Sequence, residues 1–162
     1  MDPLRIARSG AGVLRSLFQE LLGSAANMQV ETRLKRTFPV LRTPQFLSLS
    51  AMVGTNLENR ENLERFGLKS PRLARICTGL LGLTSLFLDW LFEGVTDYTA
   101  HLSGLDGFDL SRRLWQHYRD RLAGLRPGDE FDLADEFAEI VGLAGRYEWR
   151  MDPFGAGGSF AA

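Results

Sequence analysis

The sequence predicts an all-α protein of about five helices packed around one long apolar central helix, with an irregular C-terminal tail. Apolar residues recur at helical spacing along most of the chain, and no run of alternating polar and apolar residues is long enough to predict a strand. Gly, Pro, Ser and Asp, which begin and end helices, separate the helical segments. A chain of 162 residues with 44% hydrophobic residues can form one domain with its own core. We therefore expect a single helical domain over residues 1–145 and an extended tail over 146–162.

Residues 1–24 are predicted to form an amphipathic N-terminal helix. Its arginines precede every acidic residue except Asp2, and its leucines recur on one face. This pattern is typical of an organellar targeting helix, for which a mitochondrial location is favoured. A first packing helix of a cytoplasmic protein has the same pattern and remains the alternative. The helix is expected to continue to Lys35, with a weak point near Gly23.

The second helix is predicted to begin near Pro44 and to end at Gly67. Pro39 and Pro44 make the preceding stretch extended or turning, because proline lacks the backbone N–H and restricts the residue before it. Glu61 and Arg65 are spaced for an ion pair within this helix. Both observations favour a turn between two long helices.

The central apolar helix is predicted over residues 71–103, and its apolar part runs to Gly94. Ser70 is expected to cap it, because a serine hydroxyl accepts a free backbone N–H of the first turn, and Pro71 suits the first helical position. A helix that is apolar on nearly every face is buried in protein or in lipid. Asp89 argues against a lone membrane span, although a carboxylate costs less near the far end of the helix, where Asp89 lies, than at its centre.

Small residues form a strip on the central helix at Gly79, Gly82 and Ser85. Such a strip lets another helix approach closely, in lipid or in a water-soluble core. The bulky apolar residues of the same helix are predicted to contact a membrane or a partner. These predicted contact residues are Leu83, Phe87, Trp90 and Leu91.

Two shorter helices are expected to follow. After a break at Gly107, Asp109 is predicted to cap the first of them, because aspartate accepts backbone N–H bonds at a helix start. Asp129 or Asp132 is predicted to cap the second, which should stop near Gly145. The tail beyond it combines glycines with aromatic residues, and Trp149, Phe154 and Phe160 are its predicted anchors on a partner.

The search for chemistry gives no catalytic, cofactor-binding or metal-binding residues. Asp97 and His101 are four residues apart and can share a helical face, but no second pair completes a metal site. The single cysteine, Cys77, excludes an internal disulfide and is expected to be a buried thiol. The formal net charge of −1 gives no reason to expect nucleic acid as a partner.

The chain resembles the peroxin-eleven family of membrane-elongation proteins over about residues 5–118. The resemblance rests on a basic stretch, TRLKRTFPVLRTPQFL, an apolar helix containing SLFLDWLF, and the segment HLSGLDGFDLSRRLW. It implies a membrane-associated protein without catalytic activity. It also implies that four basic residues face lipid headgroups, namely Arg33, Lys35, Arg36 and Arg42.

Three functional hypotheses follow from these observations. The first is a non-catalytic accessory subunit of a larger, membrane-bound assembly, whose partners are other protein subunits and lipid. The second is a peripheral membrane-shaping protein. The third is a soluble ligand-binding protein or enzyme, with a pocket beside Trp90, Phe92 and Tyr98. Its polar groups would be Asp89, Asp97 and His101.

Overall fold

The computed structural model describes residues 3–65 and 70–143, with side chains at 15–54 and 70–143. Its elements, in chain order, are α1 (Pro3–Thr37), the 3₁₀ turn η1 (Pro39–Leu41), α2 (Arg42–Arg65), α3 (Pro71–Leu91), the 3₁₀ turn η2 (Tyr98–His101), α4 (Phe108–Arg121) and α5 (Glu130–Ile140). The described residues contain no strand, so the predicted all-α fold is confirmed.

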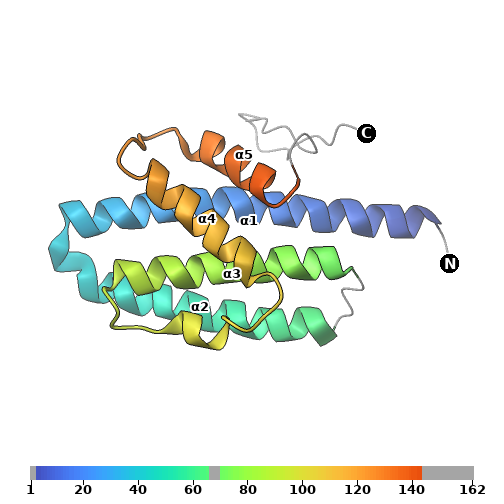
Figure 1. The fold of residues 1–162 in the computed structure, drawn as a ribbon, viewed down its shortest axis with the longest axis horizontal. Coiled ribbons are helices and arrows are strands. Elements are labelled where there is room, and N and C mark those ends of the chain that lie inside the picture. Colours follow the sequence, from blue (N-terminus) through green and yellow to red (C-terminus); the bar gives the residue numbers. More distant parts are fainter. Residues whose placement is uncertain (1–2, 66–69, 144–162) are drawn as a thin grey trace.

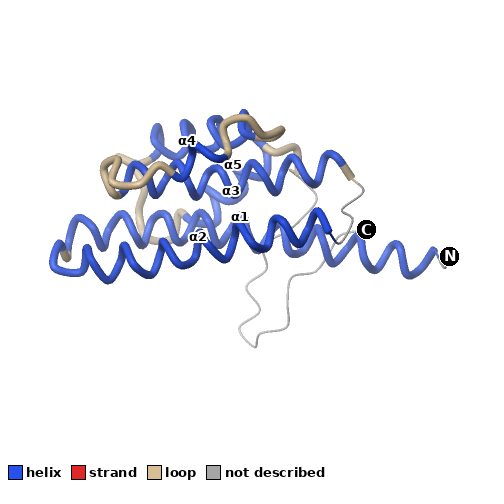
Figure 2. The backbone as a smooth tube through the Cα atoms, turned by 90° about the horizontal axis from the view of Figure 1, so that it is seen from below, coloured by secondary structure: helices blue, strands red, loops and turns tan. Residues whose placement is uncertain are grey.

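The helices form two layers with α3 between them. Helices α1 and α2 make a long antiparallel hairpin whose connection, η1, lies at the end of the molecule opposite the N-terminus (Figure 1). Figure 2 shows this hairpin on one side of α3, and α4 with α5 on the other side. Helix α4 crosses α3, and α5 also packs along α1. Helix α3 is therefore central, as predicted.

The core gathers around α3 because apolar residues occur on several of its faces. Ile76, Leu83, Leu88 and Leu91 are almost fully buried. Side chains of α1, α2, α4 and α5 join them in one continuous hydrophobic cluster. A helix that is apolar all round is thus covered by the other helices of its own chain.

The strip of small residues on α3 brings α4 unusually close. A Cβ atom placed on Gly79 would lie 2.9 Å from the Cβ of Leu110, and one placed on Gly82 would overlap the side chain of Ser111. The Ser111 hydroxyl points to the backbone oxygen of Thr78 at 3.5 Å. The predicted close approach of a second helix is confirmed, and that helix belongs to the same chain.

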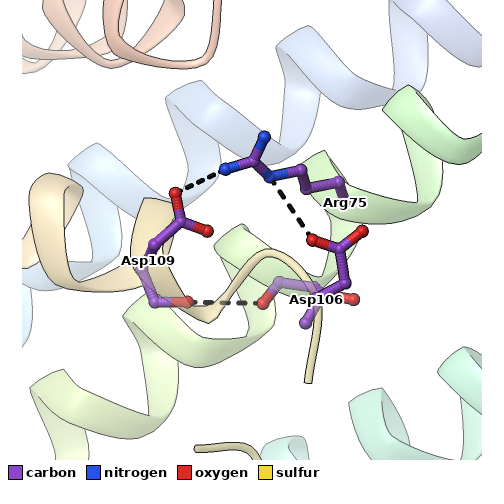
Figure 3. A network of polar contacts seen from close by, with 5 residues as sticks. Arg75, Asp106 and Asp109 are labelled. Carbon is purple, nitrogen blue, oxygen red and sulfur yellow. Dashed lines mark hydrogen bonds and ion pairs between the residues drawn. The ribbon is translucent and has the colours of Figure 1, made fainter. Parts of the chain in front are cut away.

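The start of α4 corrects one prediction. Asp109 does not cap the helix; its carboxylate accepts a 2.5 Å hydrogen bond from Arg75 on α3, and Asp106 lies 3.6 Å from the same guanidinium (Figure 3). Gly107 occupies the cap position with φ +100°, and its Cα faces the Arg75 backbone so closely that a Cβ would overlap it. The close approach of the two helices requires glycine there, so Asp109 is left to form the ion pair.

Helix α3 begins where predicted and ends earlier than predicted. Ser70 Oγ accepts a hydrogen bond from Leu73 N, which confirms the expected cap. The helix ends at Leu91 rather than residue 103, because Glu93 and Gly94 turn the chain with φ +57° and +75°. The final turn closes through a hydrogen bond from Gly94 N to Asp89 O, a typical helix ending.

The other helix boundaries also differ in detail. Helix α1 continues through Gly23 without a break and ends at Thr37. Helix α5 ends at Ile140, before the predicted Gly145, because Gly142 adopts φ +75° and its carbonyl accepts a bond from Arg72. Asp129 precedes α5, yet its carboxylate accepts from Arg126 N instead of capping the helix.

Candidate functional site

The polar residues of the hypothetical pocket have structural roles or lie exposed. Each carboxylate oxygen of Asp89 accepts two hydrogen bonds. The four donors are the hydroxyls of Thr96 and Thr99 and the backbone N–H groups of Tyr98 and Thr99. These bonds hold the turn that follows α3. Asp97 and His101 are exposed. Within the described part of the chain, no three His, Cys, Asp or Glu side chains come together as metal ligands.

The apolar residues predicted to contact a membrane or partner lie mainly in the chain's own core. Leu83 and Leu91 are fully buried and Phe87 is nearly so. Trp90 is half-buried and contacts the rings of Phe87 and Trp115 at 6.0 and 5.6 Å between centroids. In this conformation, Leu83, Phe87 and Leu91 offer no surface to another molecule, because α1, α2 and α4 cover them.

Helix α3 is nevertheless the one described helix that is long and apolar enough to cross a membrane. Of its most apolar 18-residue window, 56% is buried inside the molecule. Core helices of water-soluble proteins have the same length and composition, so this property alone is weak evidence for a membrane span.

Lys35, predicted to face lipid headgroups, instead binds the end of α3. Its Nζ donates a 2.6 Å hydrogen bond to Leu91 O, and it lies 2.9 Å from Glu93 Oε1 and 5.5 Å from the centroid of the Trp90 ring. A lysine is favoured at a helix C-terminus because the free carbonyls carry partial negative charge. The Lys35 ammonium is therefore paired within the molecule, with Leu91 O and the Glu93 carboxylate.

Arg42 shares Glu93 with Lys35. Its Nη2 atom lies 3.5 Å from Glu93 Oε2, and its side chain remains half exposed. The hydrogen bond from Lys35 and the charges of Lys35 and Arg42 lower the pKa of the Glu93 carboxyl below its usual range. These contacts join the end of α1 and the start of α2 to the loop after α3, which places this loop and η1 at one end of the molecule.

Arg33 and Arg36 are exposed on α1 beside this end and form no ion pair within the described residues. They flank a small notch with Tyr118 at its base. The Tyr118 hydroxyl donates to Met28 O and contacts the Thr32 hydroxyl, each at 3.0 Å. Burial raises the Tyr118 pKa, while the Thr32 bond and the two arginines oppose that rise. The phenol therefore stays neutral, and both guanidinium charges are available to an external anion.

Exposed apolar side chains gather at the same end, which we call the tip. Val40 is 83% exposed, Val95 73% and Leu47 63%, whereas Phe38 and Leu41 are about half exposed. Phe38, Val40 and Leu41 belong to the connection between α1 and α2, and Val95 follows Glu93, which is paired with Lys35 and Arg42. The tip thus combines outward apolar side chains with exposed arginines.

Sequence reasoning identified the basic residues of the tip and missed its apolar ones. The signal was present in the tetrapeptide Phe38–Leu41, a short apolar run that contains Pro39 and lies between two basic segments. Such a run is too short for helix periodicity, so its exposure at a turn was not anticipated. The predicted tail anchors Trp149, Phe154 and Phe160 lie outside the described residues.

Cys77 is a half-buried free thiol on α3. Burial, and to a smaller extent the nearby Glu20 carboxylate, raises its pKa. A raised pKa keeps the sulfur protonated and a poor nucleophile at neutral pH, which fits the expected packing role.

No protein-family model matches this chain, and comparisons with curated proteins and with solved structures gave no significant match. The tip, with its exposed apolar side chains beside unpaired arginines, is therefore the candidate functional surface of the described residues.

Proposed function

We propose that this chain is a non-catalytic structural protein, an accessory subunit of a membrane-bound assembly, and that its tip rests on an anionic lipid surface. The observation that carries the proposal is the joint exposure of Val40 and Val95 beside the unpaired Arg33 and Arg36. Apolar side chains with a basic border are typical of surfaces that lie at a membrane interface. The basic start of the chain favours a mitochondrial membrane.

Two contributions support attachment. Each basic side chain close to an anionic leaflet contributes about 1 kcal/mol, and this attraction weakens as salt increases. Transfer of exposed apolar area into the interface adds about 25 cal/mol per Å². Either contribution alone is weak, so we expect binding that requires both the apolar turn and the arginines. The resemblance to the peroxin-eleven family implies the same basic residues at lipid headgroups.

Flotation with lipid vesicles tests this proposal directly. The full chain should bind vesicles that contain phosphatidylglycerol and should not bind vesicles of phosphatidylcholine alone, and added salt should reduce binding. Val40→Asp should weaken binding about tenfold, because it removes an inserted side chain and adds a repelled charge. Ala74→Asp is the matched control, since Ala74 is exposed at the start of α3, at the other end of the molecule.

Absence of binding to anionic vesicles would contradict the membrane role. Equal losses for the two Asp variants would also contradict it, because binding would then depend on total charge rather than on the tip. Both variants should retain their helical circular dichroism, since both substituted side chains are exposed.

A further inference from the structure

The outer faces of α4 and α5 carry charges of opposite sign. The two helices lie side by side on the far side of α3 from the hairpin of α1 and α2 (Figure 2). Three arginines of α4 are exposed, Arg112, Arg113 and Arg119, and we call them the basic face. Every charged residue of α5 is acidic. Its exposed carboxylates include Asp132 and Glu139, which we call the acidic face.

Ion pairs between α4 and α5 are formed at the seam where the two helices meet. The Glu136 carboxylate of α5 contacts His117 and Arg121 of α4 at 2.6 and 3.3 Å. The residues of the basic and acidic faces form no ion pair within the part of the chain that the structure describes. Both faces therefore present unpaired charge to solvent.

The acidic residues of α4 do not neutralise its basic face. Asp109 is paired with Arg75 of α3. Asp120 accepts a hydrogen bond from Gln116 at 2.8 Å, and it is the other carboxylate of the helix. Three arginines thus outnumber the one carboxylate on α4 that has no cationic partner, and the outer side of the helix is net positive.

The two faces have the same spacing. Arg112 and Arg119 are seven residues apart on α4, and Asp132 and Glu139 are seven residues apart on α5. Seven residues make nearly two helical turns, so the members of each pair lie on one side of their helix, about 10 Å apart. An α4 helix laid antiparallel on an α5 helix would bring Arg112 opposite Glu139 and Arg119 opposite Asp132.

We propose that two copies of this chain associate through the outer faces of α4 and α5. Within one chain these helices run in opposite directions (Figure 1). A two-fold axis parallel to them therefore places α4 of each copy antiparallel on α5 of the other, and both ion-pair contacts occur twice. A partner of a single sign, such as nucleic acid or anionic lipid, would be attracted by one face and repelled by the other. A second copy is attracted by both.

The dimer should be weak and sensitive to salt. Exposed ion pairs contribute little individually, and salt screens them. We expect a Kd of about 100 μM at low salt and dissociation in about 0.5 M salt. Sedimentation velocity of the full chain without lipid measures both, and about half of the chains should be dimeric at a concentration equal to that Kd.

Charge reversal tests the pairing of the two faces. One variant carries Arg112→Glu and Arg119→Glu, and the other carries Asp132→Arg and Glu139→Arg; all four side chains are exposed. Each variant alone places like charges together at both contacts, so each should be monomeric. An equimolar mixture restores opposite charges at both contacts and should form a dimer of one copy of each variant.

Two further variants serve as a control and a milder test. Arg33→Glu with Arg36→Glu also reverses two exposed arginines, but these lie on α1, and the dimer should be unchanged. Arg112→Gln with Arg119→Gln should weaken the dimer at least several-fold, and it replaces the reversed α4 variant if circular dichroism shows that the latter does not fold.

Three results would overturn the inference: a monomeric unmodified chain at low salt, a dimer that persists in either reversed variant alone, or a mixture of folded variants that stays monomeric. The inference does not depend on the membrane proposal. Val40→Asp should dimerise as the unmodified chain does, so a failure of vesicle binding and a failure of dimerisation are separate outcomes.

Discussion

Apolar side chains are buried where α3 packs on α4, whereas at the tip they are exposed to solvent. At the contact, Gly79 and Gly82 let α4 approach until Leu110 and Ser111 meet the α3 backbone. At the tip, Val40 and other apolar side chains face outward. The same chain thus packs one surface closely and leaves another uncovered.

This difference separates apolar residues that stabilise the fold from those available for attachment. The apolar character of α3 is explained by its own neighbours, since Leu83 and Leu91 are fully buried. Nothing in the described residues covers Val40 or Val95, which lie beside exposed Arg36 and Arg42. An exposed apolar cluster beside a polar or charged border marks an interaction site more often than a stability feature. Substitutions in the two regions should therefore change different measurements.

Gly82→Ala should have the largest effect on the fold. The new methyl group would meet the Ser111 side chain, and overpacking of this kind lowers the free energy of unfolding by about 1–3 kcal/mol. Urea denaturation followed by circular dichroism measures the loss. The matched control is Gly23→Ala, for which space is open and a gain of about 0.5–1 kcal/mol is expected. A neutral Gly82→Ala would contradict the close contact of α3 with α4.

Among the charge substitutions, Arg33→Gln combined with Arg36→Gln should lower the affinity for anionic vesicles most. Two basic side chains near an anionic surface contribute about 2 kcal/mol together, so vesicle affinity should fall about 30-fold at low salt. Flotation at several salt concentrations measures the fall and its salt dependence. Arg112→Gln with Arg113→Gln removes the same charge from exposed sites on α4. If the α4 variant lost as much affinity, the tip would have no special role.

Glu93→Gln should have the smallest effect and the opposite sign. Glu93 partly neutralises Lys35 and Arg42, so its replacement makes the tip more positive and should raise affinity for anionic vesicles a few-fold. Flotation in parallel with the unmodified chain measures the increase, and an unchanged or lower affinity would contradict it.

Acid should lower the stability of the folded chain in part by protonating the Glu93 carboxylate. Because the folded state lowers the Glu93 pKa, the carboxylate contributes stability at pH values above its unfolded pKa, and that contribution is lost as the pH falls through the lowered folded value. Between neutral pH and acid, the unmodified chain should therefore lose more stability than Glu93→Gln. Urea denaturation at pH 7 and at pH 3.5 compares them, and equal losses would show that the ion pairs contribute nothing.

Local signals in the sequence predicted much of the fold. Ser70 followed by Pro71 predicted the start of α3, and the small residues at Gly79 and Gly82 predicted a closely packed neighbour. These features act through adjacent residues or through one helix face, so they can be read without knowledge of the tertiary structure. The end of α3 was predicted less well, because it depends on the positive φ of Glu93, a non-glycine residue, and on the hydrogen bonds that Asp89 makes to the following turn.

The candidate site was predicted only in part, because exposure depends on what each helix packs against. Lys35 shares a basic stretch with Arg33, yet it lies over Trp90 and binds Leu91 O, residues more than fifty positions away in the sequence. Phe87 and Leu83 suggested a lipid or partner surface by composition, but α1 and α4 cover them. Periodicity identifies apolar faces; tertiary contacts decide which of them remain open.

Attachment through the tip is tested most directly by measuring the environment of the tip at a membrane. Val40→Cys and Ala74→Cys, each in a Cys77→Ser background, carry an environment-sensitive fluorophore at opposite ends of the bundle. If the tip rests on lipid, the label at position 40 should shift to the blue on addition of vesicles with phosphatidylglycerol, and the label at position 74 should not. A shift at position 74 alone, equal shifts at both positions, or no shift at position 40 would contradict attachment through the tip.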